Sequence, residues 1–172
     1  WTELDRVVGL MRVAPRMRQT KLLVVNAPTG TEAACSAEKI KEVLGTEVTT
    51  VSIDDTIKAH AAIDIKAAEA EAESYWLSKA KGLLEPTRAE VVSASRYYLA
   101  LKEMMQKLGA RAVTSSGCMG PPAKGCLAFS KLWQVMERAD KAGTLVLIHT
   151  PAVGKAQALV LYYSRLERTC LG

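Results

Sequence analysis

KLLVVNAPTG, residues 21–30, is the stretch that decides the fold. A short apolar run reaches a turn of proline, threonine and glycine, which predicts a buried strand that ends in a loop. Residues 36–45 predict a helix, because Ser36 can cap its start and Gly45 its end. The β-branched residues of 47–53, EVTTVSI, predict a second strand. Strand, helix and strand in about thirty residues form a βαβ unit, whose crossover is right-handed.

The middle of the chain predicts further helices and a third strand. Residues 55–84 are rich in alanine, glutamate and lysine and predict one or two helices. Residues 87–90, TRAE, match a capping box, and apolar residues recur at three- and four-residue steps until Gly109. This pattern predicts a helix that packs against the sheet. Residues 110–115 predict the strand that follows it.

The last third of the chain predicts two helices and a fourth strand. Residues 126–138 have a helical period, and 144–149, TLVLIH, are nearly continuous in apolar residues, as in a parallel strand covered on both faces. Residues 151–154 predict a turn and 155–168 a final helix. The expected fold is a three-layer Rossmann- or flavodoxin-like α/β domain with a mainly parallel sheet of at least four strands.

Length and composition favour one ordinary domain over residues 1–172, in which residues 1–20 form a basic helical segment. The chain is 49% apolar, enough for a substantial core. It has no uninterrupted apolar run of membrane-spanning length, so we expect no membrane partner and a cytoplasmic location. Four scattered cysteines fit reduced thiols. The chain starts at Trp1, and a fragment of a longer protein is one explanation.

The net charge of +5 does not by itself predict a nucleic-acid partner. Charges of both signs are spread over the predicted helices, and aromatic residues make up only 5% of the chain. A basic groove with interleaved aromatic residues, which single-stranded nucleic acids require, is missing. We therefore expect no nucleic-acid partner.

A ligand site is expected at the carboxyl edge of the sheet, where doubly wound domains bind their ligands. Residues 26–31 follow the first strand as a nucleotide loop would, but they match neither phosphate-binding glycine motif, so the sequence favours a plain strand-to-helix turn. The loops expected at this edge contain Pro28, Thr29, Gly30, Cys118, Met119, Gly120, His149 and Thr150.

Each reactive residue type also has a structural explanation. Cys118 and Cys126 lack the close spacing of zinc ligands and are expected to pack beside a turn. His60 lies in a charged helix and is expected to be solvated. His149 ends a predicted parallel strand, where a catalytic and a hydrogen-bonded structural role both remain open. Asp54 and Asp55 follow the second strand and can equally cap the next helix.

Residues 87–130 resemble the middle domain of the L-fucose isomerase-like sugar isomerases. The helix EVVSASRYYLALKEMMQKLGA leads to a strand, a Cys118-Met119-Gly120 turn and a helix opened by CLAFS at 126–130, as in that family. The order of the preceding elements also fits. The resemblance implies a flavodoxin-like domain within a larger, commonly oligomeric enzyme. That enzyme is an aldose–ketose isomerase whose divalent metal, such as manganese, stabilises an enediol.

The chain departs from the family pattern at the metal. Family members place an acidic ligand at the end of the strand after the CLAFS-like helix, whereas this strand ends in His149-Thr150-Pro151. The second carboxylate and the C-terminal histidine would lie beyond Gly172. No metal ligand and no catalytic residue can therefore be transferred, although His149 could replace the acidic ligand.

Two functions remain open from the sequence. One is an isomerase-like domain that binds a sugar and is inactive alone, within a homo-oligomer or a larger parent protein. The other is a noncatalytic α/β module that binds a small ligand or another subunit. Ketose formation once a completing partner is added would favour the first, and ligand binding without turnover even then would favour the second.

Overall fold

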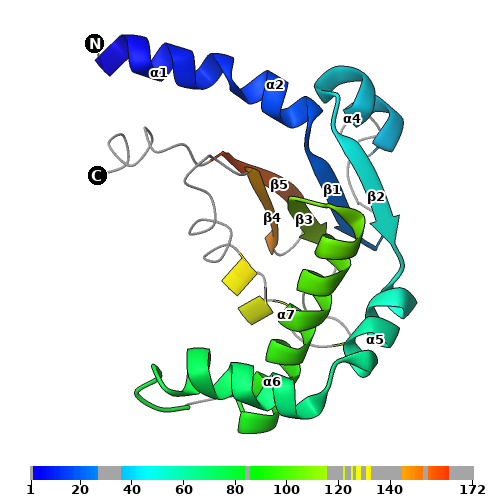
Figure 1. Ribbon diagram of the computed structural model, residues 1–172, viewed down its shortest axis with the longest axis vertical. Coiled ribbons are helices and arrows are strands. Elements are labelled where there is room, and N and C mark those ends of the chain that lie inside the picture. The colour runs from blue at the N-terminus through cyan, green and yellow to red at the C-terminus, as the bar shows by residue number, and fades with distance from the viewer. Residues whose placement is uncertain are drawn as a thin grey trace.

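The computed structural model describes residues 2–26, 36–83, 86–115, 122, 125, 127–128, 131–132, 145–152 and 155–162 (Figure 1). The helices are α1 (Thr2–Met11), α2 (Val13–Arg18), α4 (Ala37–Leu44), α5 (Ile53–Ala62), α6 (Ile65–Glu71), the π-helix η1 (Ala72–Leu77) and α7 (Arg88–Leu108). The strands are β1 (Lys21–Val25), β2 (Glu47–Val51), β3 (Ala112–Ser115), β4 (Leu145–Ala152) and β5 (Lys155–Tyr162).

The strand predicted at the start of residues 21–30 is β1, and it lies at the centre of a parallel sheet. Its order is β2-β1-β3, with Val25 paired to Val51 on one side and to Ser115 on the other. Four of the five residues of β1 are buried, as expected for a strand covered on both faces. The α/β class and the parallel sheet are therefore confirmed.

The helix boundaries follow the capping signals in the sequence. The Ser36 hydroxyl accepts a hydrogen bond from the Lys39 amide, and Thr87 and Glu90 form a reciprocal capping box at the start of α7. Gly45 and Gly109 end their helices at φ values of 71° and 64°. At Gly45 an added Cβ would also lie 2.5 Å from Arg18 Cγ, so this position requires glycine.

The sequence predicts one or two helices over residues 55–84, whereas the structure has three consecutive helical segments over 53–77. Ser52 and Asp55 cap α5 with a second capping box, and Ile63 ends it in an extended conformation. Asp64 then caps α6, which continues into the π-helix η1. The capping explanation for Asp55 is confirmed. Its hydrogen bonds to Ser52 lower the pKa of its carboxyl group.

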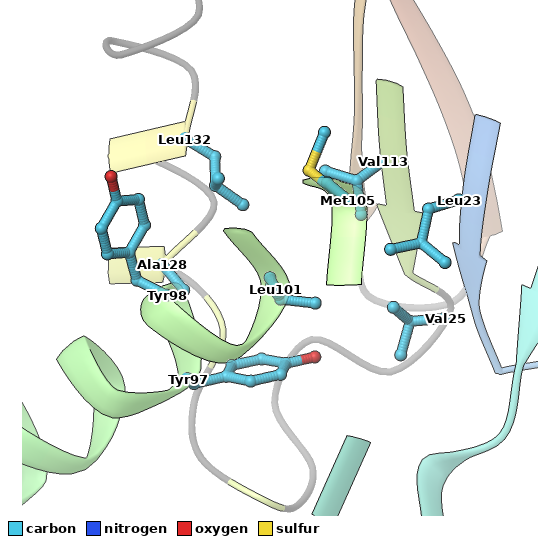
Figure 2. Packing of buried hydrophobic residues seen from close by; sticks show 9 residues of the cluster. All are labelled: Leu23, Val25, Tyr97, Tyr98, Leu101, Met105, Val113, Ala128 and Leu132. Atoms are coloured by element: carbon cyan, nitrogen blue, oxygen red, sulfur yellow. The ribbon is translucent and has the colours of Figure 1, made fainter. Parts of the chain in front are cut away.

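The main core lies between β1, β3 and α7. Figure 2 shows Leu23 and Val25 of β1 facing Leu101 and Met105 of α7. Both tyrosines of the adjacent pair in α7, Tyr97 and Tyr98, are buried. The full cluster is Leu23, Val25, Tyr97, Tyr98, Leu101, Met105, Val113, Ala128 and Leu132.

The C-terminal part of the chain differs from the prediction. Residues 145–152 form an antiparallel pair with 155–162, and the described residues contain three parallel strands rather than four. The helix expected over 155–168 is therefore wrong for 155–162. The apolar run at 158–162 is compatible with either a helix or a strand. Ala152 pairs with Lys155 across a two-residue connection typical of hairpins.

Two further predictions are tested only in part. Residues 127–128 and 131–132 are helical, and the remainder of the helix predicted at 126–138 lies outside the described residues. Among the described helices, none has the length and apolar character needed to cross a bilayer.

Candidate functional site

The carboxyl edge of the sheet brings the starts of two predicted loops together. Val25 and Ser115 are the last residues of β1 and β3, and they are paired neighbours in the parallel register. The loop that contains Pro28, Thr29 and Gly30 leaves the sheet beside the loop that contains Cys118, Met119 and Gly120. These six residues themselves lie outside the described part of the chain.

Polar groups mark this edge on the described side of each loop. Asn26 follows β1 in the left-handed region at φ 66°, which asparagine tolerates better than most residues. Its backbone N–H donates a hydrogen bond to the carbonyl oxygen of Val51 at 2.8 Å, so Asn26 extends the contact between β1 and β2. Ser115 is buried at the end of β3. The edge thus combines an unusual backbone turn with polar side chains.

The structure does not place His149 and Thr150 at the end of a parallel strand. They are internal residues of β4, where His149 pairs with Ala158 and Thr150 with Gln157. The prediction that His149 ends a parallel strand is therefore wrong. β4 contacts β3 but forms its ladder with β5, because the chain returns directly as a hairpin.

A second polar cluster surrounds Lys131, which the sequence analysis did not single out. Its ammonium group pairs with Glu71 of α6, and the two side chains are only 8% and 21% exposed. The Nζ atom also lies 3.9 Å from the ring centroid of Tyr75 and 4.7 Å from that of Tyr98. A carboxylate and two aromatic faces thus surround one buried cation.

Burial lowers the pKa of Lys131 to about 8. The Glu71 carboxylate favours the protonated amine and acts against this shift. Burial also raises the pKa of the Tyr98 hydroxyl, with a smaller contribution from Tyr75. A lysine in such a setting can be functional or structural. We interpret this cluster as structural, because its members join three separate segments of the chain.

The sequence predicts a solvated His60, but in the structure this side chain contacts another helix. Its Nε2 atom lies 3.1 Å from the carbonyl oxygen of Ser93 and 3.3 Å from the Ser93 hydroxyl, so the ring joins α5 to α7. Arg96 supports the same junction by donating to the carbonyl oxygens of Ala61 and Ile63. Burial, and to a smaller degree the charge of Arg96, lower the pKa of His60.

We expect this junction to weaken in acid. The folded pKa of His60 lies below the ordinary value of 6.5, so the unfolded chain binds more protons as the pH falls through that value. Stability that is present above pH 6.5 is then lost towards lower pH. Urea unfolding at pH 7 and pH 5 measures this loss. His60→Gln should show a smaller decrease between the two pH values, and an equal decrease in both proteins would contradict the assignment.

The described residues do not fit the manganese site that the family resemblance implies. Groups of three or more potential metal ligands are absent from the part of the chain that the structure describes. Asp55 is engaged in a helix cap, and His60 contacts Ser93. We therefore derive no isomerisation step through a metal.

Comparison with known proteins assigns no family to the chain. No protein-family model matches it, and no curated protein does. Function therefore has to be inferred from the geometry of the sheet edge and from the resemblance of residues 87–130.

Proposed function

We propose that this chain is a cytoplasmic sugar-binding domain of the L-fucose isomerase-like type, with a flavodoxin-like doubly wound sheet. The strand order β2-β1-β3 supports the fold, because it equals the first three strands of the 2-1-3-4-5 order. The resemblance over residues 87–130 supports the ligand class, since it includes the loop that follows β3. The scattered cysteines support a reducing compartment.

The pairing of Val25 with Ser115 carries the proposal. It makes two loops leave adjacent strands at the edge where α/β sheets bind small molecules. Backbone amides and small polar side chains in such loops suit a polyhydroxylated ligand, which offers many donors and acceptors. We expect the domain to bind the sugar without converting it, because the sequence has His149-Thr150-Pro151 where the family pattern has its acidic metal ligand.

Isothermal titration calorimetry with L-fucose tests the proposal. We expect saturable binding and no ketose product, with or without manganese chloride. Thr29→Trp and Met119→Trp should each weaken binding at least about tenfold, because a bulky ring in one of the two loops occupies space that the sugar needs. Leu83→Trp is the matched control, since Leu83 is exposed and distant in sequence from both loops, and it should bind normally.

Two results would contradict this function. Absence of heat at millimolar L-fucose and at millimolar concentrations of other aldoses and ketoses would exclude sugar binding. Ketose formation by the chain alone would instead show that it is catalytic.

A second candidate function, subunit interaction, is favoured by a separate observation. α1 exposes several large apolar side chains, whereas an ordinary solvated helix exposes few of them.

A further inference from the structure

Helix α1 carries an apolar row that remains exposed. Leu4, Val7, Val8 and Met11 are 55%, 41%, 38% and 72% exposed. Their spacing of three, one and three residues places them along one helical face. Figure 1 shows α1 and α2 extending from the start of β1 along one side of the molecule.

Helix α7 has a comparable apolar row, which is buried. In α7 the apolar residues at three- and four-residue steps are buried against the sheet. In α1 the row stays open within the described part of the chain, although its length and regularity are similar to two turns of α7. An uncovered row of this kind is typical of a protein–protein contact.

The charges beside the row are self-complementary. Asp5 and Arg12 project from the same flank of the helix, about 100° and 80° around the axis from Leu4. Arg12 keeps a helical backbone, so the face continues from α1 to the start of α2. An acidic end and a basic end on one flank oppose each other when two copies lie antiparallel.

We propose that α1 pairs with α1 of a second copy of this chain, antiparallel about a two-fold axis between Val7 and Val8. In this register Leu4 faces Met11 of the second copy, and Val7 faces Val8. Asp5 then lies within one helical turn of Arg12 of the second copy, and the symmetry makes this pair twice. This inference does not depend on the sugar-binding proposal.

The proposed contact between the two α1 helices buries a small area, so we expect its affinity to be low. Two helices of about ten residues bury less than the roughly 1,200 Å² of a standard stable interface. We therefore expect reversible association with a dissociation constant on the order of 10–100 μM. Sedimentation equilibrium of the whole chain between 5 and about 500 μM covers this range.

Substitution on the row tests the surface itself. Val8→Glu should weaken association at least about tenfold, because it places two carboxylates at the two-fold axis. Val43→Glu is the matched control: Val43 is also an exposed valine on a helix, and association should not change. Circular dichroism of both variants checks that their folds are retained.

Charge exchange tests the antiparallel register. Asp5→Lys and Arg12→Glu should each weaken self-association about threefold or more, because each creates two like-charge contacts. The double variant should regain the original affinity. A mixture of the two single variants should associate more strongly than either one alone, since both contacts are then between opposite charges.

Two results would overturn the proposal. A monomer at every concentration would show that the row does not pair with a second copy. A dimer that Val8→Glu leaves intact, or that the charge exchange does not restore, would place the contact elsewhere or in another register.

Discussion

Replacing Lys131 by methionine is expected to lower the free energy of unfolding by about 3 kcal/mol. The substitution leaves the carboxylate of Glu71 mostly buried without its cation, and it removes the ammonium group from the faces of Tyr75 and Tyr98. The partial exposure of Glu71 keeps the loss at the lower end of the range for buried pairs. Urea unfolding at pH 7 measures the change.

The pairing with Glu71 predicts a specific rescue. The double variant Lys131→Met with Glu71→Leu should regain most of the lost stability, because no charge is then left buried. Lys107→Met is the control, since the ion pair of Lys107 with Glu103 is exposed and should contribute at most about 0.5 kcal/mol. If Lys131→Met costs no more than Lys107→Met, the cluster does not join the segments as described.

Leu101→Ala is expected to destabilise the fold by about 3 kcal/mol. Leu101 is fully buried in α7, and Figure 2 shows it among residues of α7, β1 and β3. Truncation removes packing on the face of the sheet that α7 covers and leaves a cavity there. The midpoint and slope of urea unfolding give the free-energy change.

Val43→Ala is the matched control for the core. Val43 lies in α4 and is 75% exposed, so its truncation should change stability by less than about 0.5 kcal/mol. A loss below about 1 kcal/mol for Leu101→Ala would contradict the central position of α7 in the core.

Local signals in the sequence predicted much of this fold. The apolar run of β1 and the capping residues Ser36 and Thr87 are determined by neighbouring residues, and the structure has them where the sequence placed them. Gly45 and Gly109 ended their helices for the same reason. Such signals depend on hydrogen bonds and backbone conformations within a few residues.

Contacts between distant segments were not predictable in the same way. Glu71 and Lys131 are separated by sixty positions, and no spacing rule connects them. His60 appeared solvated because the carbonyl oxygen of Ser93 that it contacts becomes available only when α5 packs on α7. The hairpin of β4 and β5 was missed because an apolar run can form a helix or a strand until its partner is known.

The candidate site was predictable only as a position in the fold. The sequence placed loops at the carboxyl edge of a parallel sheet, and the register confirms that β1 and β3 end side by side. The identity of the ligand depends on side chains in these loops and on the resemblance of residues 87–130. It therefore stays a proposal.

Amide chemical-shift mapping with L-fucose tests the central claim most directly. Binding at the sheet edge predicts the largest shifts in residues 26–31 and 115–120, with Asn26 and Ser115 among them, and small shifts around Lys131 and along α1. Shifts that are absent at saturating sugar, or that gather away from the ends of β1 and β3, would contradict it.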